Sequence, residues 1–384
     1  MPMNEIYMDY NATTPVRDNV LDVFRGALAE CYGNASSAHF FGRRAKKVLD
    51  EAREVVAAAI NARPREIVFT SGGTESDNLA LKGVALGTGA GHVITTSIEH
   101  PGVLEAGRFL ERECFDVTYL PVTADGCVCA DDVRDAIRDD TLLVSVMWVN
   151  NETGVINPIS EIATAACDRG VPFHTDAVQA FARLPIDVSS LPVDFLSISG
   201  HKFGAPKGIG VLYVRAKQRL EPVLHGGGQE WNMRSGTQNV PAIAALGEAT
   251  RQVNAELEAE RERVGALRDR LEKGVLESVP DSFVNGFAAP RVANTSNIRF
   301  AGADGEALLL ALDAEGIAVS SASACAAAHT EPSHVLMAMG LSRRQAEDSM
   351  RFSLGHGSTV ADVDNFLEVI PGLVARVRSI AAAS

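Results

Sequence analysis

The sequence predicts an α/β fold in which a mostly parallel sheet is covered by helices. Between about residues 16 and 250, short runs rich in β-branched and aromatic residues alternate with helical stretches, which is typical of βαβ units. Residues 251–279 then carry apolar side chains at roughly helical spacing under a charged outer face, so we expect one long amphipathic helix there. Strand patterns return after that helix, and they predict a second, smaller α/β unit.

Six runs in the first part are short and apolar enough for buried strands, and residues 44–60 among them have a helical pattern. The predicted strands are EIVFT (66–70), GHVITTS (91–97), DVTYLPV (116–122), LLVSVMWV (142–149), VPFHTD (171–176) and DFLSIS (194–199). In the last third they are TSNIRF (295–300), AVSSASAC (318–325) and SMRFSLG (349–355).

Length and charge limit the classes of function. The chain has 384 residues, 46% of them hydrophobic, so it can bury a substantial core and is long enough for two domains. Its 35 basic and 49 acidic residues give a net charge of −14, which disfavours nucleic acid and anionic membrane surfaces. The stretch MPMNEIYMDYNATTP lacks the pattern of a signal peptide, and no later run is apolar enough for a membrane helix. We therefore expect a cytoplasmic protein with protein or small-molecule partners, no nucleic-acid binding and no membrane association.

The cysteines are scattered and too few for a disulfide framework at this length. Two of them, Cys127 and Cys129, lie too close together for the usual zinc pairing and have no matching Cys/His pair, so no metal site is predicted. The six are Cys31, Cys114, Cys127, Cys129, Cys167 and Cys325.

Cys325 stands in a run of small residues, SSASACAAAH, that offers almost no apolar area to bury. Packing holds such a segment poorly, so we expect a mobile loop with an accessible thiol. The alternative, a small buried thiol, fits the other five cysteines better. After the loop, Thr330, Glu331 and Pro332 predict a helix start, because proline is tolerated in the first turn.

The stretch EIVFTSGGTESDN combines a strand, a glycine turn at Gly72 and Gly73, and an acidic helix start. Free backbone N–H groups and the helix dipole make such a turn favourable for a phosphate. Many strand-to-helix turns need glycine for backbone reasons only, so this motif has little weight alone.

Two further predicted strands end in complementary groups: Asp176 ends one, and Ser199, His201 and Lys202 lie at the end of the other. A pyridoxal phosphate site needs a lysine to form an imine, a carboxylate for the pyridine nitrogen, and donors for the phosphate. The alternatives are a helix cap for Asp176 and a solvated surface position for Lys202. The apolar run before Lys202 and the glycine-rich GAPKGIG after it argue against the second.

Motifs in order along nearly the whole chain match those of a known enzyme family. They are YMDYNATTP, YGNASSAHFFG, FTSGGTESDN, TSIEHPGVL, VNNETG, HTDAVQ, SGHKFGAPKGIG, MRSGTQN, SSASACAAAHTEPSHVL and RFSLG. Together they resemble the cysteine desulfurases, a group of class V aminotransferase-like pyridoxal phosphate enzymes. The long cysteine segment before EPSHV is similar to the NifS/IscS type, whereas the shorter segment of the other branch, often resembling GHHC, is absent.

That resemblance implies the type I fold of pyridoxal phosphate transferases, with a mostly parallel seven-stranded sheet in the large domain and a smaller α/β C-terminal domain. It places the large, cofactor-binding domain at residues 15–255 and the small domain, with the cysteine loop, at residues 1–14 and 256–384. It also implies a homodimer with active sites near the subunit interface.

For the cofactor, the resemblance implies that Lys202 forms the imine, that Asp176 pairs with the pyridine nitrogen, and that His100 stacks on the ring and takes part in proton transfer. Further residues bind the rest of the cofactor: Asn151 and Gln179 near the ring hydroxyl, and Gly73, Thr74, Ser199, His201 and Thr237 of the partner subunit at the phosphate.

For the substrate, the resemblance implies that Arg351 grips the carboxylate with its planar fork, and that Asn151 lies beside it. Taken alone, Arg351 would fit a surface ion pair, His100 a packed histidine and Gln179 an exposed amide. The sequence departs from the family pattern at Ala322, where glycine is usual, and at His356, where arginine is common. The first departure bears on loop mobility, and the second on acceptor docking.

The activity implied is removal of sulfur from L-cysteine, giving L-alanine and a persulfide on Cys325, whose thiolate is the nucleophile. The persulfide would pass to an acceptor protein, such as an iron–sulfur scaffold, a tRNA-thiolation relay or a DNA-modification system. A selenocysteine lyase and an aminotransferase of the same fold remain alternatives. A non-catalytic docking subunit is a third alternative, disfavoured because all the chemical residues are present.

Overall fold

The structure is a computed structural model of the 384-residue chain and describes residues 5–321 and 331–382. Cys325 and Ala322, on which two of the predictions rest, lie outside these ranges, as does Thr330. Within the described ranges, no helix is both long and apolar enough to cross a membrane. The same residues contain no group of three His, Cys, Asp or Glu side chains arranged to hold a metal ion.

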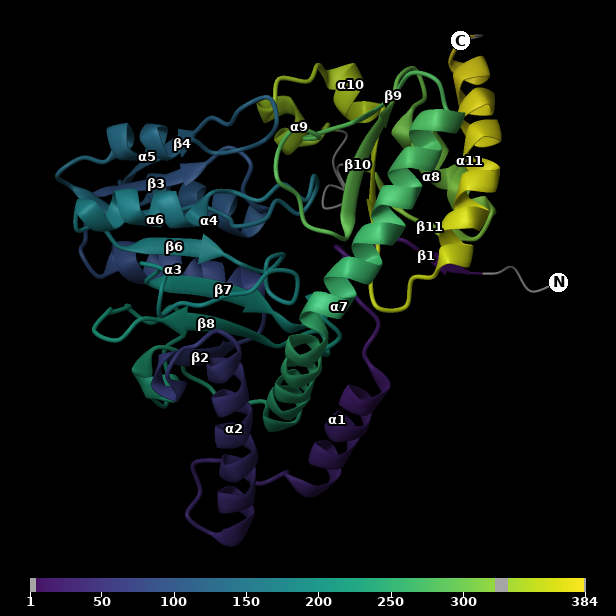
Figure 1. Ribbon diagram of the computed structural model, residues 1–384. Helices are drawn as coiled ribbons and strands as arrows, with labels where there is room; N and C mark the ends of the chain where they lie inside the picture. The colour runs from purple at the N-terminus through teal and green to yellow at the C-terminus, as the bar shows by residue number, and fades with distance from the viewer. Residues whose placement is uncertain (1–4, 322–330, 383–384) are drawn as a thin grey trace.

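A seven-stranded sheet forms the larger part of the molecule, with the strand order β2-β8-β7-β6-β5-β3-β4 (Figure 1). Its strands are β2 (Ile67–Thr70), β3 (His92–Thr96), β4 (Asp116–Leu120), β5 (Thr141–Ser145), β6 (Phe173–Asp176), β7 (Phe195–Ser199) and β8 (Gly210–Val214). All neighbouring pairs are parallel except those made by β8, which runs antiparallel to β2 and β7. The mostly parallel sheet predicted from the sequence is therefore confirmed.

Helices cover both faces of this sheet, so its strands are apolar on both sides. On β2, Val68 belongs to a core formed with α3 and α4, whereas its neighbour Phe69 belongs to a core formed with α2, α6 and the first part of α7. The helices of this part are α1 (Asp18–Glu30), α2 (Phe40–Ala59), α3 (Gly73–Leu86), α4 (Pro101–Arg112), α5 (Ala130–Ala136) and α6 (Ile159–Asp168).

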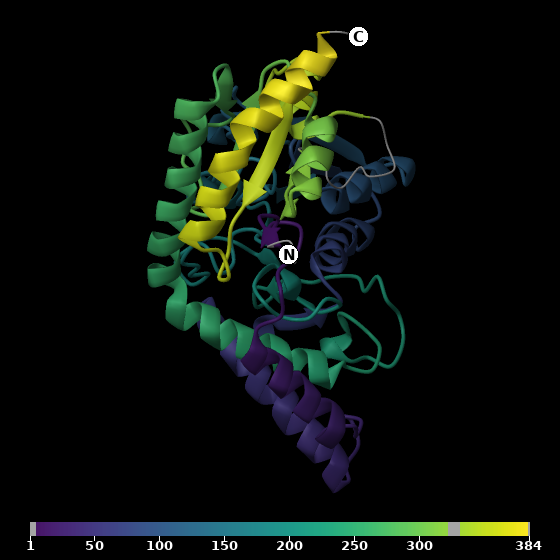
Figure 2. The same cartoon turned by 90° about the vertical axis from the view of Figure 1, so that its right-hand side faces the viewer.

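Helix α7 (Val240–Ser278) links this part to the rest of the molecule through 39 residues. Val253 packs in the core of the large sheet and Val264, three turns later, in the core of the smaller sheet. Figure 2 shows α1 and α2 side by side with the start of this helix, while α11 lies along its other end. The sequence prediction started the helix at residue 251, which was wrong by about three turns. The first turns are buried almost all round, so they lack the charged face that marks the later ones.

The smaller unit contains the four-stranded antiparallel sheet β12-β13-β10-β9 and a parallel pair of β1 and β11. Phe300, Phe352 and Phe366 form the centre of its core. The strands are β1 (Ile6–Tyr7), β9 (Ser282–Val284), β10 (Thr295–Phe300), β11 (Ile317–Ala318), β12 (Ser320–Ser321) and β13 (Ser349–Ser353). The helices are α8 (Gly305–Ala314), α9 (His334–Ala338), α10 (Arg343–Glu347) and α11 (Val360–Ala381).

The helix predicted to start at residues 330–332 begins later. Ser333 is the N-cap of α9, because its hydroxyl accepts a hydrogen bond from the backbone N–H of Leu336, so Pro332 precedes the helix instead of lying in its first turn. The strand predicted over residues 318–325 is likewise shorter in its described part, where Val319 separates β11 from β12. Residues 8–14 connect β1 with α1 and contact both sheets, because Asn11 is hydrogen-bonded to Thr295 on β10 and to Lys202 after β7.

Candidate active site

A cavity of about 250 Å³ lies at the carboxyl ends of β6 and β7, beside the first turn of α3. This edge of an open α/β sheet is where ligands generally bind. Ten of the predicted site residues line the cavity: Gly73, Thr74, His100, Asn151, Asp176, Gln179, Ser199, His201, Lys202 and Arg351. The structure therefore brings together groups that are as much as 278 residues apart in the sequence, from Gly73 to Arg351.

The glycines of the first turn of α3 are required by close packing. A Cβ atom on Gly73 would lie 2.7 Å from Cγ2 of Val178, and one on Gly210 would lie 2.6 Å from Cα of Gly72. Gly72, the N-cap, has a φ of 156°. The turn thus presents bare backbone and the positive end of a 14-residue helix to the cavity, next to Ser199. This arrangement suits a phosphate.

Lys202 lies in a 3-10 turn that directly follows β7. Its Nζ donates to the backbone oxygens of Asn11, at 2.7 Å, and Ala12, at 2.8 Å. The lysine is therefore held inside the site, so the surface position considered for it is wrong. Nδ1 of the adjacent His201 lies 3.1 Å from Oγ1 of Thr13, and burial followed by the charge of Lys202 lowers the pKa of His201 to about 4.

Asp176 is a buried carboxyl at the end of β6. Its Oδ1 accepts a hydrogen bond of 2.8 Å from the backbone N–H of Val178. Burial raises the pKa of Asp176 to about 6, and the nearby Lys202 acts in the opposite direction. Asp77, also buried and lining the cavity, has a pKa well above its usual range because of burial and then the charge of Asp176. A cationic group in the cavity would therefore find its carboxylate at Asp176.

His100 is the N-cap of α4, where its Nδ1 accepts a hydrogen bond of 3.0 Å from the backbone N–H of Gly102. Because Nδ1 accepts, the ring proton belongs on Nε2. Burial, with the neighbouring charges of Lys202 and His334, lowers the pKa of His100 to about 4. The ring is thus neutral near pH 7, with an N–H to donate from Nε2.

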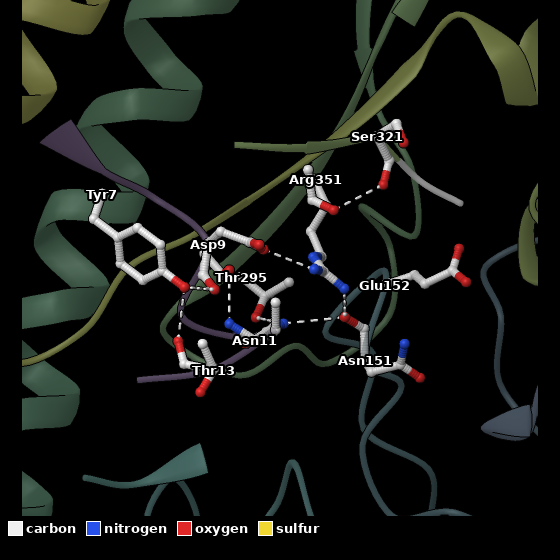
Figure 3. Close-up of polar contacts among 12 residues, drawn as sticks. Tyr7, Asp9, Asn11, Thr13, Asn151, Glu152, Thr295, Ser321 and Arg351 are labelled. Carbon is white, nitrogen blue, oxygen red and sulfur yellow. Dashed lines mark hydrogen bonds and ion pairs between the residues drawn. The ribbon is translucent and has the colours of Figure 1, made fainter. Parts of the chain in front are cut away.

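Arg351, on β13, is only 3% exposed, so the surface ion pair considered for it is wrong. Its Nη2 bonds Oδ1 of Asp9 at 2.7 Å, and its Nη1 donates to the backbone oxygen of Asn151 at 3.1 Å (Figure 3). Nε is buried and has no partner among the described residues. The cavity therefore contains a fixed guanidinium with donor capacity to spare.

Two comparisons decide the family. The family model of class V aminotransferases matches residues 6–366. The cysteine desulfurase IscS of Methanosarcina thermophila is 47% identical over 376 residues, covering 97% of this chain and 93% of its own.

The chain belongs to the class V aminotransferases, among the cysteine desulfurases.

Solved structures agree with this family. A NifS-like protein superposes with a TM-score of 0.90 at 37% identity, covering 97% of this chain and 100% of its own. The structure of SspA in complex with cysteine has a TM-score of 0.82 at 40% identity, covering 91% of this chain and 99% of its own. Class V aminotransferases of the NifS type are pyridoxal phosphate enzymes of fold type I, so the predicted fold is confirmed.

Thr237, which was predicted to serve the cavity of the partner subunit, lies outside the cavity of its own chain. Thr237 is exposed on the segment before α7 and is not among the residues that line the described cavity. Asp9, Asn11 and Asp77, by contrast, have no role predicted from the sequence. The first two lie in YMDYNATTP and the third in FTSGGTESDN, so the motifs contained the signal, but only the fold shows what these side chains contact.

Cys325 lies outside the described residues, but the chain on either side of its segment reaches the site. Ser320 pairs with Arg351 across β12 and β13. On the other side, Ser333 donates to the buried carboxylate of Glu152, and Nε2 of His334 lies 2.9 Å from the backbone oxygen of Glu99. The ends of the cysteine segment are thus anchored next to Arg351 and next to the neighbours of Asn151 and His100.

Proposed function

We propose that this chain is a cysteine desulfurase that removes sulfur from L-cysteine and gives L-alanine and a persulfide on Cys325. The observation that carries the proposal is one cavity that contains an amine, a buried carboxyl and a guanidinium, those of Lys202, Asp176 and Arg351. An amino acid substrate offers an amine and a carboxylate, and Arg351 is suited to the second.

The residues present fit pyridoxal phosphate. The bare glycine turn of α3 suits the phosphate, and Asp176 suits a protonated ring nitrogen. Oε1 of Gln179 is buried and has no partner among the described residues, as expected if it faces a polar group of a ligand. The residues that would hold the cofactor are Gly73, Thr74, His100, Asn151, Asp176, Gln179, Ser199, His201 and Lys202. When bound, the cofactor supplies an electron sink for bond cleavage next to the substrate amine.

The geometry supports different roles for Lys202 and His100 in proton transfer. Nδ1 of His100 accepts from the backbone N–H of Gly102, so the neutral ring can donate a hydrogen bond from Nε2 but has no free lone pair with which to accept a proton. Lys202, as a neutral amine, can accept the α-proton of the substrate. Arg351 meanwhile holds the substrate carboxylate, which orients the substrate between these two groups.

Sulfur transfer then needs a nucleophile, for which Cys325 is the residue proposed. Its thiolate attacks the sulfur of L-cysteine, so the new S–S bond forms as the Cβ–S bond of the substrate breaks. The electron pair of that bond stays with the carbon skeleton, which takes up a proton and leaves as L-alanine. In total, a thiol and L-cysteine become a persulfide and L-alanine, with no external oxidant or reductant.

The proposal is tested with Cys325→Ser, alongside Cys129→Ser as a matched control at an exposed cysteine. The Cys325 variant should bind pyridoxal phosphate as the wild type does, yet release very little alanine, because a serine hydroxyl stays protonated near neutral pH. The control should keep its activity. Alanine release by Cys325→Ser at the wild-type rate would overturn the proposal.

We further infer a homodimer in which Thr237 serves the cavity of the partner. Thr237 is exposed and outside its own chain's cavity, and Trp231, on the same segment, is also exposed. Thr237→Ala should therefore weaken pyridoxal phosphate binding without unfolding the protein, and sedimentation should give twice the chain mass. A monomer that binds the cofactor normally would contradict this.

The acceptor of the sulfur is proposed to be another protein, such as an iron–sulfur scaffold. The net charge of −14 favours a docking partner with a basic surface. Trapping mixed disulfides from cells that express Cys325 as the only cysteine would identify it. Capture by a Cys325-free variant in equal amount would rule out sulfur delivery from this residue.

A further inference from the structure

Asn11 lines the cavity, and both its side chain and its backbone are hydrogen-bonded. It lies in the segment between β1 and α1 and is 2% exposed. In its side chain, Nδ2 donates to Asn151 O and Thr295 Oγ1, and Oδ1 accepts from Arg183 Nη2 and Asn294 Nδ2. In its backbone, the N–H donates to Ser353 Oγ, and the oxygen accepts from Gln179 Nε2 and Lys202 Nζ. All of its polar groups are therefore satisfied, and each contact constrains where the residue lies.

Two of these contacts connect Asn11 to the groups expected to hold the substrate. Its backbone oxygen lies 2.7 Å from Nζ of Lys202. Its Nδ2 donates at 3.1 Å to the backbone oxygen of Asn151, which also accepts from Nη1 of Arg351 at 3.1 Å (Figure 3). Asn11 is thus bonded directly to the lysine and shares a carbonyl acceptor with the arginine.

The partners of Asn11 also belong to both parts of the molecule. Thr295 and Ser353 lie on β10 and β13 of the smaller sheet. Gln179 and Lys202 lie just after β6 and β7 of the larger one. Because the amide and the backbone of this one buried residue bond groups of both sheets, a shift of either sheet would leave buried donors or acceptors unpaired.

We propose that Asn11 is a positioning residue that sets the separation between the Lys202 amine and the Arg351 guanidinium. The inference rests on the proposed function, because the substrate amine and carboxylate are joined through one carbon atom. A site that uses both groups must keep the lysine and the arginine at a fixed separation. Asn11 does so by bonding one and sharing the acceptor of the other.

A residue with a purely structural role should affect stability and leave the reactivity of Lys202 unchanged. Asn285 offers the comparison, because it is also a buried asparagine, in the smaller unit, and its Nδ2 donates to Oδ1 of Asn297 and Oγ of Ser349. It is not among the residues that line the described cavity. Asn285→Ala should therefore cost stability without altering Lys202.

The first test is chemical labelling of Lys202 in cofactor-free protein with acetic anhydride, quantified by mass spectrometry against exposed Lys207. Asn11→Ala should raise the relative labelling of Lys202 by about fivefold or more, because the carbonyl that holds the amine is no longer anchored. Asn285→Ala should match the wild type. If both variants lower the unfolding temperature equally and neither changes the labelling, Asn11 is structural only.

The second test measures binding of L-alanine to cofactor-loaded protein through the visible spectrum, which requires no turnover. Asn11→Ala should weaken binding about tenfold. Unchanged affinity would refute the link to Arg351. If Asn11→Ala does not fold, Thr295→Val is tested in its place, because it removes one hydrogen-bond partner of Asn11. Its effects on Lys202 labelling and on L-alanine binding should have the same direction and be smaller. If the wild type makes no alanine from L-cysteine, the proposed function fails, but the labelling still decides the role of Asn11.

Discussion

Asp9 and Arg351 form a nearly buried ion pair across 342 residues of sequence, with Oδ1 and Nη2 2.7 Å apart. The hydroxyl of Tyr7 donates to the backbone oxygens of Asp9 and Thr13, which fixes the acidic partner (Figure 3). The carboxylate compensates the charge of the guanidinium and sets its orientation before any ligand binds.

Replacing Arg351 by alanine should therefore weaken L-cysteine binding, because the substrate carboxylate loses a charge-assisted contact of roughly 1.5–3 kcal/mol. Asp9→Asn should keep the guanidinium and raise KM by less, since only its orientation is affected. Steady-state kinetics of both variants provide the measurement. Equal KM for Arg351→Ala and wild type would refute the assignment.

Lys202→Ala should abolish the visible absorbance of protein reconstituted with pyridoxal phosphate, because no other amine lines the described part of the cavity. The matched control is Lys207→Ala, which removes an exposed lysine five residues away and should keep the spectrum. Difference spectroscopy after dialysis measures both. An unchanged spectrum in the Lys202 variant would show that the lysine is misassigned.

Glu99→Gln should change how stability depends on pH. Burial raises the pKa of Glu99 from 4.5 to about 8, so the folded state binds a proton that the unfolded state releases between these values. Stability of the wild type is therefore lost as the pH rises through this window, by up to about 1 kcal/mol per pH unit.

Glutamine keeps the oxygen that accepts from Met147 and Thr96 and removes the ionisation. The variant should thus gain stability relative to the wild type from pH 5 to 8, as followed by urea unfolding. Parallel pH profiles of the two proteins would mean that Glu99 is already ionised at the lower pH.

Arg53→Ala should destabilise the protein by about 3–5 kcal/mol, because it leaves the carboxylate of Glu230 buried without its cation. The guanidinium of Arg53 also lies 4.5 Å from the ring centroid of Phe69 and 4.5 Å from that of Trp231. Lys46→Ala, which removes an exposed ion pair of the same helix, should cost less than about 1 kcal/mol. Chemical denaturation compares the two, and equal losses would contradict the prediction.

The sequence predicted most of the large sheet because strands buried on both faces are continuous apolar runs. It named no strand at β8, whose apolar run directly follows the glycine-rich segment after Lys202. The chemical residues at strand ends could be predicted because their types match a known chemistry. The ion pair of Asp9 and Arg351 and the contacts of Asn11 could not, because no periodicity relates residues that lie 140 to 342 positions apart.

Other predictions stay open. The boundary at residue 255 falls inside one continuous helix, so the proposed division into residues 15–255 and the remainder stays a prediction. His356 is described, with its ring nearly perpendicular to that of Tyr10 and 5.7 Å between the centroids. Its effect on acceptor docking also stays a prediction. The thiol chemistry of Cys325 rests on the sequence motif and on the anchored ends of its segment.

Helix α7 has a mechanical consequence for the chemistry. The helix connects the larger sheet, whose strand β7 leads into Lys202, with the smaller sheet, whose strand β13 contains Arg351. The stretch between Val253 and Val264 belongs to neither core. Twenty residues of helix span about 30 Å. A change of about 5° in the bend between Val253 and Val264 would therefore displace the C-terminal end of α7 by about 3 Å. A displacement of that size is as long as a hydrogen bond. Figure 2 shows the helix bent between its two ends, so the angle of this bend must be maintained, alongside the contacts of Asn11, for the amine and the guanidinium to act on the same small molecule.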